Sequence, residues 1–288
     1  MCETVIPSEL VIPTGRPFYK LTGSGNDFVF VDVRSAPPGE LGDVATIRAV
    51  CARGSGVGAD GIVFLDAGQT SAVAIRYLNS DGSVAALCGN ATLCAARLAK
   101  ELQIVSGDRD FTIDTDSGEV TARFRDGRPE IDLQPVIDVQ DCFAATLEAG
   151  EARIGFAMVG VPHLVVLVPD VERAPVVERG RALRHHSKLT HGANVNFVSG
   201  STGRWRMRTY ERGVEAETLA CGTGAVATAL LLAAWGQAGG AVELETKSGR
   251  SLRVRQRVAA GPERFTSLSG EARIVFVGKL GELLSSTT

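Results

Sequence analysis

The sequence predicts an α+β protein of two similar domains, each a mostly antiparallel or mixed sheet wrapped around one central helix. Three observations predict this fold: short strand-like runs, one Ala-rich helical run in each half, and an internal repeat with a period of about 134 residues. Because this period is far longer than a solenoid unit, it indicates two domains facing each other across a cleft. We expect the active site in that cleft.

The repeat consists of four matching segments that occur in the same order in both halves. The matched pairs are residues 25–31 with 160–166, residues 58–65 with 192–199, Tyr77 with Tyr210, and residues 87–99 with 220–233.

The strands are predicted from apolar and β-branched runs with Gly, Asp and Ser at the turns. They are expected at residues 28–32, 61–65, 74–78 and 111–115 in the first half, and at 164–168, 195–199, 205–210 and 242–246 in the second. Each half has one clear helix, which begins at a Cys-Gly dipeptide and is apolar all round, so we expect it to be buried. The expected domains are residues 18–135, completed by 270–288, and residues 136–269, after an N-terminal extension of residues 1–17.

Composition and charge narrow the class of partner. The 30 Lys plus Arg residues against 33 Asp plus Glu give a net charge of −3 without a basic block. We therefore expect a small-molecule partner, and neither nucleic acid nor a membrane. The longest apolar stretch, residues 225–235, is shorter than the ~20 residues of a membrane span. The amino terminus lacks the cationic lead of a signal peptide, which indicates the cytoplasm.

The six cysteines form no CxxC pair, which argues against a disulfide scaffold or a zinc site. His185, His186 and His191 lie in a polar, Arg-rich stretch that is typical of a surface loop, so no metal site is expected.

Cys88 and Cys221 occupy the same position of the repeat, at the start of the two predicted helices. The unpaired NH groups and the dipole of a helix start favour a thiolate, so we expect a lowered cysteine pKa. The same NH groups can hold a carboxylate, and the residues that follow the cysteines are small or short: Gly89, Asn90, Gly222 and Thr223. Two thiols meeting across a cleft can remove a proton from one face of a carbon and deliver one to the other. This pattern predicts a racemase or epimerase that needs no cofactor.

Seven motifs, taken in order, resemble the diaminopimelate epimerase family, whose members work without pyridoxal phosphate. They are GSGNDFVFVD at 23–32, GVGADG at 56–61, NSDGS at 79–83, CGN at 88–90, ANVNF at 193–197, YERG at 210–213 and ETLACGTGA at 217–225. The resemblance covers nearly the whole chain from Phe18 onward. It implies an isomerase that interconverts LL- and meso-diaminopimelate for lysine and peptidoglycan precursor synthesis, with Cys88 and Cys221 exchanging the roles of base and acid.

The resemblance also implies substrate contacts. Gly89, Asn90, Gly222 and Thr223 match positions that bind the reacting carboxylate, and Asn26 matches a substrate-contacting asparagine. Asn79, Asn194 and Arg212 match the group that holds the distal amino acid end. Glu211 matches a residue that contacts the ammonium group, and with His163 it resembles a modulator of the thiol pKa values. Without the family, Asn26 equally suits a turn, Arg212 a solvated strand end, and His163 a structural role.

Several alternatives stay open from the sequence. Val161 stands where the family usually has asparagine, which favours a related racemase acting on another amino acid as the second choice. More remote alternatives are a thiol redox protein, an amino-acid-binding protein and a pyridoxal-phosphate racemase. For the assembly, the sequence leaves a homodimer open.

Overall fold

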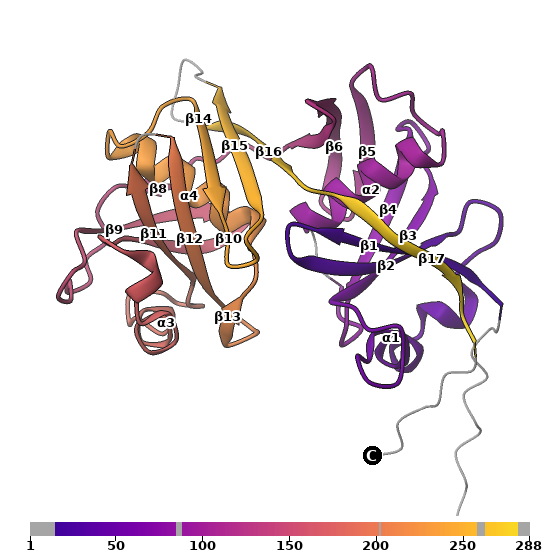
Figure 1. Cartoon of the computed structure of the whole chain (residues 1–288), viewed down its shortest axis with the longest axis horizontal. Coiled ribbons are helices and arrows are strands. Elements are labelled where there is room, and N and C mark those ends of the chain that lie inside the picture. Colours follow the sequence, from indigo (N-terminus) through magenta and orange to yellow (C-terminus); the bar gives the residue numbers. More distant parts are fainter. Residues whose placement is uncertain (1–14, 85–87, 202, 258–262, 282–288) are drawn as a thin grey trace, which may run out of the picture.

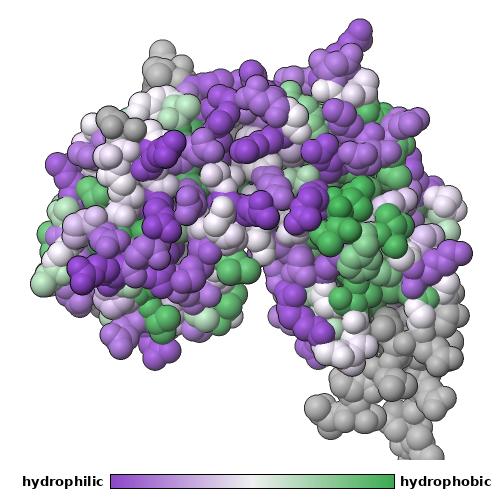
Figure 2. Space-filling view, in the orientation of Figure 1, coloured by the Kyte–Doolittle hydropathy of each residue, from purple (hydrophilic) through white to green (hydrophobic). Residues whose placement is uncertain are grey.

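The structure, a computed structural model, describes residues 15–84, 88–201, 203–257 and 263–281. Residues 1–14 of the expected extension and the last seven residues of the expected completing segment lie outside this description. Figure 1 shows two lobes of strands, each built around a helix and joined by β16 (Phe265–Gly270) and β17 (Arg273–Lys279). In Figure 2 a notch separates the lobes below this joint. The predicted class, α+β with two domains and a mixed sheet in each, is confirmed.

The first lobe is built from the amino-terminal half of the chain. Its strands are β1 (Pro17–Gly23), β2 (Asn26–Asp32), β3 (Gly61–Ala67), β4 (Val73–Asn79), β5 (Phe111–Thr115), β6 (Gly118–Arg125) and β7 (Arg128–Asp132). Its helices are η1 (Gly39–Gly42), α1 (Val44–Cys51) and α2 (Gly89–Glu101). β17 pairs antiparallel with β1, so the last strand of the described residues lies on the sheet of this lobe.

The second lobe contains the remaining elements. Its strands are β8 (Val139–Gln140), β9 (Arg153–Val159), β10 (Val161–Leu167), β11 (Asn194–Ser201), β12 (Arg204–Glu211), β13 (Ala216–Thr218), β14 (Ala241–Glu245), β15 (Ser251–Arg257) and β16. Its helices are η2 (Val171–Arg173), α3 (Val176–Arg184) and α4 (Gly222–Ala234).

Both lobes pair their strands in the same way. β1 and β2 are antiparallel, β2 and β3 parallel, β3 and β4 antiparallel, and β4 and β5 parallel. The same alternation holds for β9 with β10, β10 with β11, β11 with β12, and β12 with β14. β2 and β10 are offset by 161 − 26 = 135 residues, and α2 and α4 by 222 − 89 = 133. The internal repeat therefore corresponds to a repeat of structure.

The two predicted helices form the interior of the lobes. α4 is buried along nearly its whole length because Ala, Val and Leu cover every face, and it packs on β9, β10 and β15. α2 is buried from Gly89 to Ala96 and ends in solvent at Glu101. Its Ala-rich composition lets the surrounding strands approach closely.

Two further helices, α1 and α3, were not predicted. α1 buries Ile47, Val50 and Cys51 against β3, at the i, i+3, i+4 spacing of an amphipathic helix. α3 buries Val176 and Leu183 against β11 and β12. They occupy equivalent places between the parallel strands of each lobe, where a crossover connection is required.

The lobes are joined by sheet hydrogen bonds and by a buried ion cluster. β16 of the second lobe pairs antiparallel with β7 of the first. At this joint Glu130, only 2% exposed, accepts hydrogen bonds from Arg125 and Arg255 at 3.1 and 3.0 Å, and from Ser267 at 3.1 Å. Because Arg255 and Ser267 belong to the second lobe, the Glu130 carboxylate ties the two lobes together.

Candidate functional site

Each central helix begins directly after a cysteine. Cys88 and Cys221 both have extended backbone angles, and their carbonyls accept the first helical hydrogen bonds at 2.9 Å, from Thr92 and Ala225. The Cys221 sulfur itself accepts a hydrogen bond from the Gly224 NH at 3.4 Å. Both cysteines are therefore N-cap residues, as the repeat predicts for equivalent positions.

The two helix starts meet at the centre of the molecule. A Cβ added to Gly222 would lie 4.0 Å from the Gly89 Cα and 3.0 Å from Leu268 Cδ2. A Cβ added to Gly89 would lie 2.9 Å from the same Leu268 methyl. The glycines are therefore required for the close approach of the helices to each other and to Leu268, in addition to leaving the backbone open to a ligand.

Burial controls the pKa of both thiols. It raises the pKa of Cys88 to about 11 and that of Cys221 to about 12, and the nearby Glu211 charge acts in the same direction. Hydrogen bonds from the Ala91 NH to Cys88 and from the Gly224 NH to Cys221 act to lower these pKa values. The sequence prediction is thus right that the helix start lowers the thiol pKa values. It is wrong for the net pKa values, because desolvation of the sulfur atoms outweighs the effect of the helix start.

The same electrostatic contacts place residues of both lobes in one cluster. Charge at Cys88 raises the pKa of Cys221 across the lobe boundary. Glu211, at the end of β12, has a pKa raised by burial and by the charge of Asp60 in the first lobe. The structure therefore brings Cys88, Cys221 and Glu211 together, as the sequence prediction requires of one site.

Asn26 and Asn90 belong to this cluster through a hydrogen-bond chain. Asn90 Nδ2 donates to Asn26 Oδ1 at 2.6 Å, and Asn26 Nδ2 donates to Asp60 Oδ2 at 3.0 Å. Among the described residues, the buried Asn90 Oδ1 has no hydrogen-bond partner. Thr223, half-buried on α4, lies with its Oγ1 3.6 Å from the Cys221 sulfur.

His163 is fully buried on β10 and is neutral. Burial and the charge of Arg212 lower its pKa to about 3. Asn196 Oδ1 accepts from Thr209, which turns Asn196 Nδ2 toward His163 Nδ1 at 3.2 Å. Nδ1 is then the acceptor and Nε2 carries the hydrogen, as assigned from this network. No described residue accepts a hydrogen bond from Nε2.

The residues expected to hold the distal end lie in two places. Asn194 Oδ1 accepts from the Arg212 backbone NH at 2.7 Å, so these two form one unit in the second lobe. Asn79 in the first lobe accepts from Tyr77 Oη and donates to Ser83 Oγ, both at 3.0 Å. The Asn79 side chain therefore orders its own turn in this structure.

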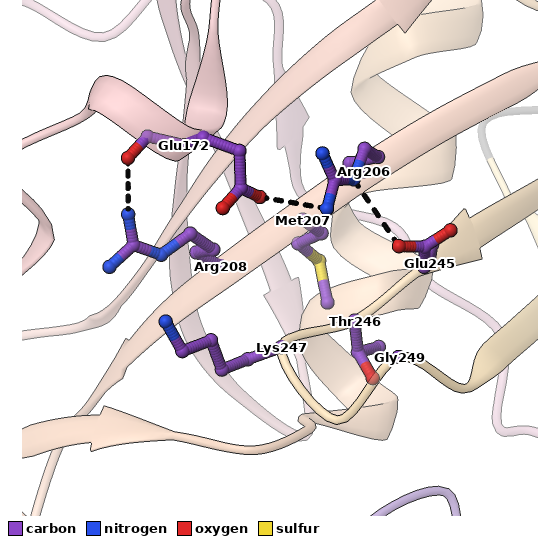
Figure 3. A pocket seen from close by; sticks show the side chains of 8 residues that line it. All are labelled: Glu172, Arg206, Met207, Arg208, Glu245, Thr246, Lys247 and Gly249. Carbon is purple, nitrogen blue, oxygen red and sulfur yellow. Dashed lines mark hydrogen bonds and ion pairs between the residues drawn. The ribbon is translucent and has the colours of Figure 1, made fainter.

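A separate cavity of about 170 Å³ opens on the second lobe, and Figure 3 shows the side chains that line it. Arg206 pairs with Glu172 at 3.1 Å and with Glu245 at 3.3 Å, and Arg208 binds Glu217 through two nitrogens. The cavity contains none of the predicted site residues, and its arginines are paired with neighbouring carboxylates.

Sequence reasoning missed three residues of the site region. Asp60 stands inside the GVGADG motif, where an acidic residue just before a buried strand was the available signal. Asn196 stands inside the ANVNF motif, but its contacts with His163 and Thr209 depend on neighbouring strands. Leu268 gave no signal, because it meets the two helix starts only in the folded chain. Within the described part of the chain, no group of three or more His, Cys, Asp or Glu side chains could hold a metal ion. No described helix has the length and apolarity to cross a membrane.

Known proteins resemble the chain over nearly its full length. The family model described as Diaminopimelate epimerase matches residues 18–135 and 155–275. The diaminopimelate epimerase of Gemmatimonas aurantiaca is 45% identical over 277 residues, which are 92% of this chain and 99% of the relative. That of Aquifex aeolicus is 39% identical over 280 residues, or 92% and 98%. A crystal structure of the Bacillus anthracis phenazine biosynthesis protein of the PhzF family has a TM-score of 0.71 at 14% identity, covering 93% of this chain and 99% of that chain, and it shows the shared fold.

The two-lobed fold, the family model and the relatives define an isomerase of the epimerase class. The chain belongs to the diaminopimelate epimerase family. The resemblance identified from the sequence motifs is thereby confirmed.

Proposed function

We propose that this protein interconverts LL- and meso-diaminopimelate, with Cys88 and Cys221 as the two proton-transfer groups. Family membership supports the substrate. The observation that carries the mechanism is the meeting of two helix starts, each preceded by a cysteine, around Gly89 and Gly222.

In the proposed reaction, one sulfur is a thiolate and the other a thiol. The thiolate takes the α-proton and becomes a thiol, while the opposite thiol gives its proton to the other face of the carbon and becomes a thiolate. No proton is gained or lost, and the two cysteines have exchanged roles.

The reacting carboxylate is assigned to the helix starts. The NH groups of Gly89, Asn90, Gly222 and Thr223 belong to the first turns of α2 and α4, where helix geometry leaves them without intrahelical partners. Charge that spreads onto the carboxylate as the α-proton leaves would meet these fixed dipoles, each worth ~3 kcal/mol when well placed.

Glu211 and His163 are assigned to control of the thiol charge. The Glu211 carboxylate opposes thiolate formation at both cysteines in the free protein. A substrate ammonium group beside it would offset this charge and so favour the thiolate. Because His163 is neutral, its contribution is hydrogen bonding through Nε2 rather than a positive charge.

The distal amino acid end is assigned to Asn194 and Arg212 of the second lobe and to Asn79 of the first, as the family resemblance implies. An arginine suits a carboxylate because its guanidinium can bind both oxygens. Val161, half-buried at the start of β10, supplies no polar contact there. This residue favours the second candidate, a racemase that acts on another amino acid.

The test is α-proton exchange in D2O with LL-diaminopimelate and with a panel of monocarboxylic amino acids, in the purified protein without added cofactor. We expect deuterium uptake with diaminopimelate, and a loss of about 10²- to 10⁴-fold in epimerisation in Cys88→Ser and Cys221→Ser. The exposed Cys142→Ser is the matched control and should retain full activity. Turnover of monocarboxylic substrates alone would replace the first candidate by the second.

We further propose that the protein works in the cytoplasm and that its domains divide as the sequence predicts, at residues 18–135 with 270–288 and at 136–269. The pairing of β17 with β1 supports the return of the chain to the first domain.

We also propose a homodimer formed through β17. Val275, Phe276 and Val277 are 47%, 47% and 58% exposed, and Figure 2 shows apolar surface on this lobe. β17 pairs with β1 along one edge, and no described strand pairs with its other edge. If β17 of a second copy paired antiparallel with β17 of the first about Val275, the free β17 edges of both copies would be covered. This register places Arg273 opposite Val277 of the other copy and so avoids placing it opposite the like-charged Lys279. Light scattering should give twice 30.3 kDa for the parent and 30.3 kDa for Val277→Lys, whereas a monomeric parent would contradict the dimer.

A further inference from the structure

Asp60 belongs to a hydrogen-bond chain that ends at Asn90, the second residue of α2. Arg53 donates to Asp60 Oδ1 at 2.6 Å, and Asp60 Oδ2 accepts from Asn26 Nδ2 at 3.0 Å. Asn26 Oδ1 in turn accepts from Asn90 Nδ2 at 2.6 Å. Three links therefore connect an exposed arginine to a 3% exposed asparagine at the start of α2.

The charge of Asp60 fixes the direction of every link. An ionised carboxylate only accepts hydrogen bonds, so Asn26 must turn its NH₂ toward Asp60 and its carbonyl oxygen toward Asn90. Asn90 must then turn its own NH₂ toward Asn26. The side-chain carbonyl oxygen of Asn90 therefore points away from Asn26. Asp60 sets the orientation of the Asn90 amide although the two side chains are not in direct contact.

The free end of the chain lies at the other helix start. Asn90 Oδ1 is 3.7 Å from the position that a Cβ on Gly222 would occupy, next to Cys221. It is buried without a hydrogen-bond partner among the described residues. A buried unpaired carbonyl oxygen costs free energy, so this acceptor favours a ligand that brings a hydrogen-bond donor.

We propose that Asp60, held by Arg53, is a positioning residue that makes Asn90 present an acceptor to the ammonium group on the reacting carbon of the substrate. This inference rests on the proposed function, because an α-ammonium is the donor that an amino acid substrate brings to this place. Asn90 then serves both charges of the amino acid: its backbone NH faces the carboxylate, and its side chain faces the ammonium.

Asp60 also has a structural role that the test must separate. Its Oδ2 accepts from the Asp27 NH at 3.1 Å, and its backbone NH donates to the Asp27 carbonyl at 2.8 Å. Asp60→Asn keeps the size of the side chain but puts an NH₂ in place of one oxygen. That NH₂ must face either the Arg53 guanidinium or the donors of Asn26 and Asp27. In both orientations the variant places two hydrogen-bond donors opposite each other.

Removing Arg53 as well relieves this conflict. In Arg53→Met/Asp60→Asn the NH₂ of residue 60 can face the space left by the exposed arginine, and its carbonyl oxygen can again accept from Asn26. Asp60→Asn alone should therefore lower kcat/KM for LL-diaminopimelate about tenfold, and the double variant should recover most of it. The matched control is Asp32→Asn, which removes the charge of an ion pair with Arg34 in the same lobe and should leave kcat/KM unchanged.

Two readouts distinguish amide orientation from stability. Asp60→Asn should weaken inhibition by an amino acid product but not by heptanedioate, which carries the carboxylates without the ammonium groups. In the substrate-free protein, NMR should show the Asn90 side-chain NH₂ protected from solvent exchange in the parent, exposed in Asp60→Asn and protected again in the double variant.

The results separate this inference from the proposed function. A parent without diaminopimelate turnover refutes the proposed function, and the NMR comparison still tests the chain. An active parent whose Asp60→Asn variant keeps full kcat/KM, or whose double variant is no better than Asp60→Asn, overturns the inference. Equal weakening of heptanedioate would show that Asp60 acts on the fold of the site and not on the ammonium contact.

Discussion

The reactivity of Cys88 tests the balance between burial and the helix start. Burial raises its pKa from 9.0 to about 11, despite the lowering by the NH groups of Ala91 and Asn90. At pH 7.5 only about 1 in 3,000 molecules then has a thiolate at this position. A cysteine of pKa 9.0 would have a hundredfold more thiolate at the same pH.

The expected alkylation rate follows from two opposing effects. The smaller thiolate population slows alkylation about 100-fold, whereas a thiolate of higher pKa is more nucleophilic, by about 6- to 10-fold for this shift. Cys88 in the substrate-free protein should thus react with iodoacetamide at least about tenfold more slowly than an unstructured cysteine peptide, with any steric hindrance adding to the difference.

Peptide-resolved mass spectrometry measures this rate, with the cysteine peptide in the same tube and the exposed Cys142 as an internal check that the reagent is active. Between pH 7 and 9.5 the Cys88 rate should rise tenfold per pH unit without a plateau, because its pKa lies above this range. If Cys88 reacted faster than the peptide at pH 7.5, or if its rate levelled off below pH 9, the helix start would outweigh burial, which contradicts a raised pKa of Cys88.

Three further predictions concern stability. The lowered pKa of His163 destabilises the folded state in acid, because the histidine of the unfolded chain takes up a proton below pH 6.5 while the native histidine stays neutral to about pH 3. The free energy of unfolding in urea should therefore fall by about 3 kcal/mol from pH 7 to 4, and this loss should be absent in His163→Gln. Gly222→Ala places a methyl 3.0 Å from Leu268 Cδ2 and should cost about 1–3 kcal/mol, whereas Gly222→Ala/Leu268→Val should cost less than the sum of the single variants, and strict additivity would contradict the contact. Glu130→Gln should lower the free energy of unfolding by about 3 kcal/mol because its arginines lose a buried partner, whereas the exposed Glu119→Gln control on β6 should change it by less than about 0.5 kcal/mol.

The repeat explains how much of the fold could be predicted from the sequence. The strands and the two central helices have regular apolar patterns, and the equivalent positions of Cys88 and Cys221 show which residues must be related in space. α1 and α3 were missed because each is short. Three spaced apolar residues such as Ile47, Val50 and Cys51 are too few to predict a helix. A helix this short is stabilised mainly by packing against the sheet.

The residues of the candidate site also fall into those that the sequence predicts and those that it does not. The cysteines, the glycines after them and Asn26 could be identified, because each lies within a short sequence motif. Asp60 lay in such a motif, but its role depends on three hydrogen bonds to residues distant in the sequence. No local pattern indicates the orientation of an amide.

The order and spacing of the repeat put a cysteine at the start of each central helix, and both are properties of the amino-acid sequence. The charge of those cysteines depends on the folded protein. The dipole of a helix start is a local property and lowers the pKa, whereas the desolvation that raises it to about 11 and about 12 depends on which distant residues cover the sulfur atoms. Tertiary packing also leaves the Asn90 carbonyl oxygen without a partner among the described residues, since its amide is oriented through Asn26 by Asp60, which lies just before β3.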